Sequence, residues 1–160
     1  MNRTISQDCE VSVASACPEC GASLLHGDTF QENFHALLLL EGQVPGAPGS
    51  ITHFFTVACY VLQHPDSMNF TADALQGLET SLREALAGRA TVEDLRRRAR
   101  YAANGNVRVT RRESDPPVSW RRGGWQMTVA DVVTVAPDEY VDTVQRWARS
   151  ISDTLAGDPS

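Results

Sequence analysis

Two cysteines near the start of the chain are the residues best suited to chemistry. Cys17 and Cys20 stand three positions apart in the run CPECG, residues 17–21, which we call the knuckle. Two thiolates at this spacing in a tight turn can take adjacent corners of a tetrahedron. Pro18 stiffens such a turn, and Gly21 lets backbone amides approach the sulfurs. The pattern predicts a metal site, with zinc ahead of iron. A redox pair or two unrelated thiols are the alternatives.

A closed zinc site needs four ligands, and the knuckle supplies two. The remaining candidates are a water molecule and the other cysteine and histidine side chains: Cys9, His26, His35, His53, Cys59 and His64. His64 follows a predicted helix at residues 51–63, which stops before Pro65. We expect His64 to be the third ligand, with a structural histidine as the alternative. Cys59 falls on the opposite, apolar face of that helix and is expected to be a buried thiol.

His53 and Tyr60 share a face of the predicted helix with His64 at 100° per residue. Eleven residues separate the two histidines, about 16 Å along an unbroken helix, which is too far for one ion. His53 is therefore expected either to bond local backbone or to act as a ligand or acid–base group in a cleft. If the metal keeps an open position, His53 and Tyr60 are the candidate catalytic residues of a zinc enzyme.

The elements that must position these residues are helices. Caps, stops and apolar spacing predict helices at about residues 29–41, 51–63, 71–87, 91–102 and 137–155. Residues 107–111 could be a short strand, and residues 128–135 are either helix or strand. We expect a mainly α protein, a helical bundle with a zinc-knuckle-like CPxCG turn at its N-terminal end. Residues 17–156 would form a single domain after a weakly ordered lead at residues 1–16.

Composition indicates the class of protein and the compartment in which it works. The chain has 160 residues, of which 42% are hydrophobic, and this predicts one globular unit. Its longest apolar run, residues 36–40, is far shorter than the ~20 residues that a membrane span needs. The first residues carry no apolar signal segment, so we expect a reducing cytoplasm, where cysteines serve as thiols or metal ligands.

Charge is unevenly distributed. The net charge is −6, yet residues 89–122 hold ten arginines against four acidic residues. We interpret this stretch as a solvated surface with salt bridges, and nucleic-acid binding is not expected. A contact surface for phosphate or an acidic partner is the alternative.

Several stretches in order resemble an uncharacterised bacterial domain-of-unknown-function family. Members open with a CPxCG knuckle and carry a helix reading HxLTVxxYxxQHP. The matching stretches here are the knuckle and residues 34–41, 53–65, 116–120, 128–132 and 144–148. The resemblance implies a small helical protein with a metal knuckle and no assigned activity. Relatives often carry a third cysteine where this chain has Phe30. Cys9, His26 or His35 would then substitute, or the metal keeps an open position, or this member has lost it.

Three functions follow from these residues. The first is a zinc-binding helical protein whose Cys/His site joins the knuckle to the helix at residues 51–63. The second is a small zinc enzyme with an open metal position near His53 and Tyr60, acting on a small molecule. The third is a module that binds nucleic acid or an acidic partner. The sequence leaves open whether the protein is an enzyme.

Overall fold

The described part of the chain is almost entirely helical. The computed structural model describes residues 16–23 and 29–157, so nearly all of the expected lead lies outside it. The elements are α1 (Phe30–Gly42), α2 (Ile51–Gln63), α3 (Ala72–Leu86), α4 (Val92–Tyr101), η2 (Ala102–Asn106), α5 (Val129–Val132), η3 (Pro137–Glu139) and α6 (Tyr140–Ala156). Only two isolated β-bridges and no strand occur among these residues. The predicted mainly α class is confirmed.

Side-chain caps fix where the helices begin. Thr29 and Glu32 form a reciprocal capping box at the start of α1. Thr91 and Asp94 form a second capping box at the start of α4, with aspartate in the place of the usual glutamate. Ser50 caps α2 by accepting a hydrogen bond from a backbone amide. These polar caps are local signals, which is why the starts of the helices were predictable.

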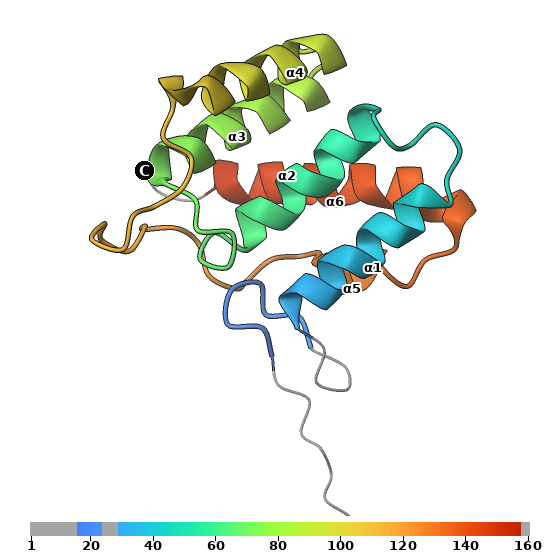
Figure 1. The fold of residues 1–160 in the computed structure, drawn as a ribbon. Coiled ribbons are helices and arrows are strands. Elements are labelled where there is room, and N and C mark those ends of the chain that lie inside the picture. Colours follow the sequence, from blue (N-terminus) through green and yellow to red (C-terminus); the bar gives the residue numbers. More distant parts are fainter. Residues whose placement is uncertain (1–15, 24–28, 158–160) are drawn as a thin grey trace, which may run out of the picture.

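The core forms where α2 packs against α6 and α3. Figure 1 shows α2 crossing α6, with the α3–α4 pair on one side of it and α1 on the other. The predicted apolar stripe of α6 is wholly buried and consists of Tyr140, Val144, Trp147, Ile151 and Leu155. The indole Nε1 of Trp147 donates to Gln63 Oε1 at 3.2 Å. Gln63 in turn donates to the Met127 carbonyl at 2.7 Å, which anchors the end of α2.

The structure departs from the expected elements at the edges of the bundle. The segment at residues 107–111 forms no strand and makes only a single bridge, between Phe70 and Thr110. The undecided segment at residues 128–135 contains the short helix α5. Helix α4 buries only Leu95, and Ala99, one turn further along, is exposed.

Three of the four arginines of α4 lie in ion pairs on the surface, and the fourth, Arg96, donates to the Gly49 carbonyl. Arg97 pairs with Asp94, Arg98 with Glu84, and Arg100 with Glu93. This arrangement is that of a solvated helix face with its charges matched.

None of the helices at residues 29–157 combines the length and the apolar character that crossing a membrane requires.

Candidate metal centre

The knuckle folds as a tight turn closed by backbone hydrogen bonds. The amide of Cys17 donates to the Ala22 carbonyl at 2.7 Å, and Gly21 N–H donates to the Cys17 carbonyl at 2.9 Å. Gly21 has a φ of +79°, which side chains other than glycine adopt only with strain. The turn therefore needs glycine at this position because of its backbone conformation.

Backbone amides point at both sulfurs, as the sequence led us to expect. The Cys20 amide lies 3.2 Å from Cys17 Sγ, and the Ala22 amide lies 3.4 Å from Cys20 Sγ. Both cysteines are 3% exposed. Burial, and to a smaller degree the neighbouring Cys17, raises the pKa of Cys20 to about 12. A cation at this position would favour the thiolate forms, because metal ligands must be deprotonated.

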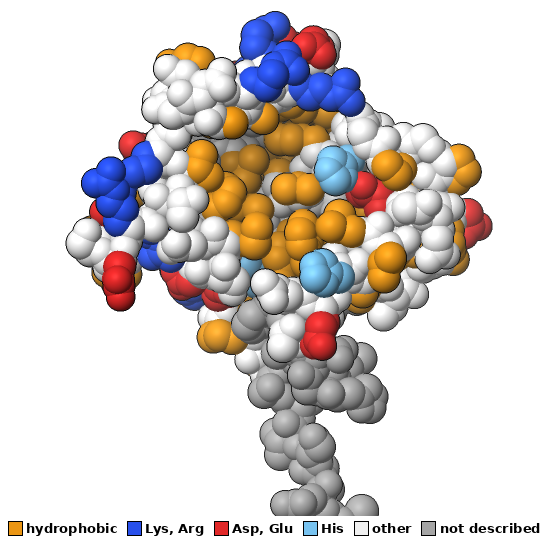
Figure 2. Space-filling view, viewed as in Figure 1, with side chains coloured by type: hydrophobic (Ala, Val, Ile, Leu, Met, Phe, Trp, Pro, Cys, Tyr) orange, Lys and Arg blue, Asp and Glu red, His pale blue; other side chains and the backbone are white. Residues whose placement is uncertain are grey.

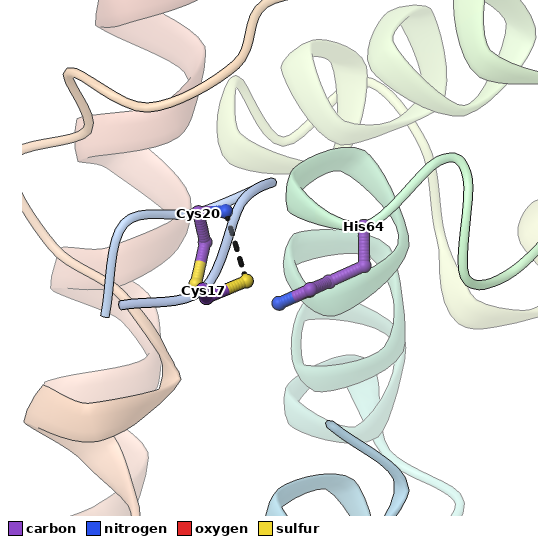
Figure 3. Close-up of side chains that lie close together, drawn as sticks. All are labelled: Cys17, Cys20 and His64. Carbon is purple, nitrogen blue, oxygen red and sulfur yellow. Dashed lines mark hydrogen bonds between the residues drawn. The ribbon is translucent and has the colours of Figure 1, made fainter. Parts of the chain in front are cut away.

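His64 completes a buried group of three potential ligands. It is the C-cap residue of α2, where the chain leaves helical geometry before Pro65. The ligand atoms of Cys17, Cys20 and His64 all lie within 4.8 Å of one another. Figure 3 shows the histidine ring pointing from the end of α2 toward the two sulfurs. The structure thus brings together the three residues that the sequence put forward as ligands.

The hydrogen bonding of His64 suits it to metal binding. Its Nδ1 lies 2.8 Å from the Tyr60 carbonyl oxygen, which can only accept, so Nδ1 carries the proton. The basic lone pair is then on Nε2. Burial lowers the pKa of His64, and this favours the neutral imidazole that a metal requires.

Glu19, between the two cysteines, ties the knuckle to the corner after α2. Its Oε1 accepts from the Asp66 amide at 2.7 Å, and its carboxylate also accepts from the amide and hydroxyl of Ser67. The Glu19 carbonyl accepts from the Gly123 amide at 2.8 Å. Glu19 is only 4% exposed. Nothing in the sequence marked this residue, because its partners lie 47 or more positions away.

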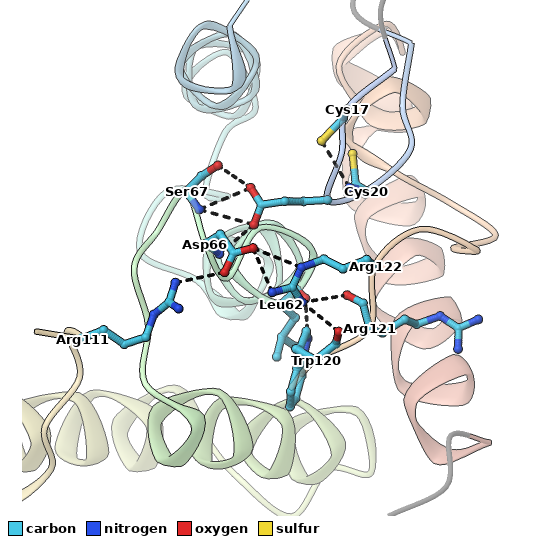
Figure 4. A network of polar contacts seen from close by, with 10 residues as sticks. Cys17, Cys20, Leu62, Asp66, Ser67, Arg111, Trp120, Arg121 and Arg122 are labelled. Carbon is cyan, nitrogen blue, oxygen red and sulfur yellow. Dashed lines mark hydrogen bonds and ion pairs between the residues drawn. The ribbon is translucent and has the colours of Figure 1, made fainter. Parts of the chain in front are cut away.

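Ion pairs also stabilise the corner after α2. The Asp66 carboxylate lies 3.0 Å from Arg111 and 2.9 Å from Arg122 (Figure 4). Trp120, two residues before Arg122, donates its indole N–H to the Leu62 carbonyl at 2.8 Å. Two of the arginines in the Arg-rich stretch therefore brace the corner that carries His64.

Tyr60, on α2, lies beside the cluster of Cys17, Cys20 and His64. Its ring stacks on His64 with centroids 4.1 Å apart and on Phe34 with centroids 4.5 Å apart. Burial raises the pKa of Tyr60 well above its usual range, with smaller contributions from Cys17 and Cys20. The phenol is therefore protonated and close to the two sulfurs.

His53 lies elsewhere. Its Nδ1 is 2.6 Å from Glu41 Oε1, and it is not part of the cluster. The structure separates the two candidate catalytic residues, with Tyr60 beside the cluster and His53 paired to a carboxylate near the start of α2. Neither Glu41 nor this pairing was anticipated, since the two residues come from different helices.

The remaining candidate ligands do not join the cluster. Cys59 is fully buried in the main core, and His35 is exposed. Cys9 and His26 lie outside the described residues.

Fold and site together define a small, mainly helical protein with a buried two-cysteine, one-histidine cluster of metal-binding spacing. The chain belongs to a family of unknown function, DUF5946, whose model matches residues 15–156. This confirms the resemblance to an uncharacterised domain family. No curated protein and no solved structure matches the chain.

Proposed function

We propose that Cys17, Cys20 and His64 bind one zinc ion that fastens the knuckle to the end of α2. The observation that carries the proposal is the convergence of three buried ligand atoms within 4.8 Å of one another. The two segments are more than forty residues apart in sequence, so an ion between them would act as a cross-link.

The donor set favours zinc. Two sulfurs and one imidazole nitrogen suit a tetrahedral, borderline-soft ion, whereas calcium and magnesium prefer oxygen. Amide donors to the sulfurs and the Tyr60 carbonyl at His64 Nδ1 supply the outer hydrogen bonds usual at such sites. The fourth ligand would be Cys9, His26 or a water molecule. A cytoplasmic location, where the thiols stay reduced, goes with this proposal.

A structural role is the one that the surroundings support best. The three ligands are buried, and Glu19 fixes the same corner through backbone hydrogen bonds. The ion would therefore stabilise an arrangement that the chain already favours.

A zinc enzyme is the second candidate, and Tyr60 is the observation in its favour. A water in the fourth position, with the protonated phenol close by, would resemble a catalytic site. His53 would then act at a distance from the metal. X-ray absorption of the zinc protein would distinguish the two, because a ligand shell completed by a protein side chain supports the structural role and one completed by water supports catalysis.

Metal content tests the proposal. Protein purified under reducing conditions without a histidine tag should contain about one zinc per chain by elemental analysis. Cys17→Ser, Cys20→Ser and His64→Ala should each lose most of it, whereas His35→Ala, an exposed histidine outside the cluster, should retain it. Metal-free wild-type protein, or full occupancy in the three ligand variants, would refute the proposal.

A further inference from the structure

Glu41 is a buried carboxylate outside the metal centre. It is only 2% exposed, and both of its oxygens are engaged. Oε1 lies 2.6 Å from His53 Nδ1, and Oε2 accepts from the Tyr140 hydroxyl at 2.9 Å. The hydroxyl oxygens of Tyr140 and Thr56 also lie 2.7 Å apart. A buried carboxylate is costly, and this one is held by a donor from each of two other helices, His53 on α2 and Tyr140 on α6.

The hydrogen bond to Glu41 determines which ring nitrogen of His53 faces a ligand. The Glu41 oxygen accepts, so Nδ1 of His53 carries a proton, and in the neutral imidazole Nε2 is then a hydrogen-bond acceptor. A carboxylate at Nδ1 of a neutral imidazole fixes the tautomer and the orientation of the ring. The His53 side chain is 44% exposed, so a ligand can reach its ring.

His53 is not placed to bind a metal. Within the described ranges, the one group of three or more metal-binding side chains is Cys17, Cys20 and His64. His53 belongs to no such group, and its Nε2 is better suited to a hydrogen-bond donor on an organic molecule.

An apolar hollow lies over α2, with α1 on one side and the α3–α4 pair on the other (Figures 1 and 2). Helices α1 and α2 meet at Glu41–His53 at one end and at the Phe34–Tyr60 stack at the other, so they run in opposite directions. Leu38 lies one turn beyond Phe34, and Val57 lies one turn beyond His53; both are only partly buried. Figure 2 shows a hollowed face with hydrophobic side chains on its floor and histidine and acidic side chains at its edge.

We propose that this hollow binds an apolar small molecule with one hydroxyl group, a phenol-like ligand whose hydroxyl donates to His53 Nε2. The aromatic ring of Phe34 and the aliphatic side chains of Leu38 and Val57 match an apolar body. Nε2 requires a donor rather than a second acceptor. An anionic head group would be repelled by the Glu41 carboxylate behind the imidazole. The hydrogen bond at His53 involves none of the three candidate metal ligands.

A matched pair of ligands tests the proposal by NMR with ¹⁵N-labelled histidine. 4-Propylphenol should shift the Nε2 resonance of His53 and bind about tenfold more tightly than 4-propylanisole, which lacks the donor. His53→Phe should abolish that preference. The free protein should already show His53 protonated at Nδ1, a measurement that needs no variant.

Cys20→Ser serves as the control that separates this site from the metal centre, because it should lose zinc but keep the preference for the phenol. Absence of a phenol-induced shift at His53, or equal affinity for phenol and anisole, would overturn the proposal. So would a His53 tautomer protonated at Nε2.

Discussion

Glu19 shows how a single side chain can organise the site without being a ligand. It lies between the two cysteines, and its carboxylate receives two backbone amides and a hydroxyl from the corner at Asp66 and Ser67. The cysteines and His64 are on opposite sides of this contact. The spacing of the three candidate ligands therefore depends on a hydrogen-bonded carboxylate as well as on any ion.

Replacing Glu19 by alanine should loosen both the corner and the metal site. Two amides would lose a charged acceptor in a buried place, and we expect a loss of about 2 kcal/mol in the free energy of unfolding. Zinc affinity should fall about tenfold or more, as for other outer-shell partners. Denaturant unfolding and competition with a chelating dye would measure the two effects.

Glu19→Gln is the matched control, since its amide oxygen can still accept one of these hydrogen bonds. It should lie between wild type and Glu19→Ala in both measurements. An alanine variant with unchanged zinc affinity would contradict the role assigned to Glu19.

Sequence patterns could predict which three residues come together in the cluster but not their surroundings. Cys17 and Cys20 share a local turn, and His64 follows from the stop that Pro65 imposes on a helix. Glu19 and Glu41 gain their roles only from partners brought close by tertiary packing. A spacing rule within one segment contains no information about such contacts.

The helices differ in how far local signals determine them. The bounds of α2 match the expected helix at residues 51–63, because a serine cap and a proline stop frame it. The face of α4 was less predictable. The apolar residues of α4 are spaced as on one face of a helix. This ten-residue helix lies at the edge of the bundle, however, and buries only Leu95.

The N-terminal cap of α4 should make stability depend on pH. Hydrogen bonds from the Thr91 amide and hydroxyl, with help from Arg97, lower the pKa of Asp94 from 3.8 to about 2. A lowered pKa in the folded state stabilises the fold above pH 4, and this contribution is lost as the pH falls toward 2. Asp94→Ala should therefore melt at a lower temperature than wild type at pH 7, and the difference should disappear near pH 2.

Thermal melts between pH 2 and pH 7 measure this effect. Glu113→Ala, an exposed acidic residue outside the helices, is the control and should show little difference at either pH. A difference for Asp94→Ala that persists unchanged at pH 2 would show that the cap acts through something other than the ionised carboxylate.

The whole molecule consists of a large helical core and a small separate cluster at the knuckle. The core draws its buried residues from α1, α2, α3, α5 and α6, whereas the knuckle cluster contains only Cys17, Cys20 and Ala22 with Trp125 packed against it. A core of this size does not depend on the knuckle for its burial. The metal is therefore expected to order one end of the molecule rather than to fold it.

Removal of the metal should have a correspondingly local effect. A strong chelator should leave the helical circular dichroism at 25 °C nearly unchanged and lower the melting temperature. Amide hydrogen exchange should accelerate in the knuckle and at residues 64–67, but not in α6. Global loss of helix on chelation would show that the ion supports the core as well, and unchanged exchange in the knuckle would argue against binding there.

Cobalt substitution tests the central claim most directly. Co²⁺ added to metal-free, reduced protein should bind at one equivalent, with the intense visible bands of a tetrahedral ion and a thiolate charge-transfer band. Cys17→Ser should weaken that band, and Cys59→Ala should leave it intact. Weak bands of a six-coordinate ion, or a spectrum that the ligand variants do not alter, would contradict a site built from Cys17, Cys20 and His64.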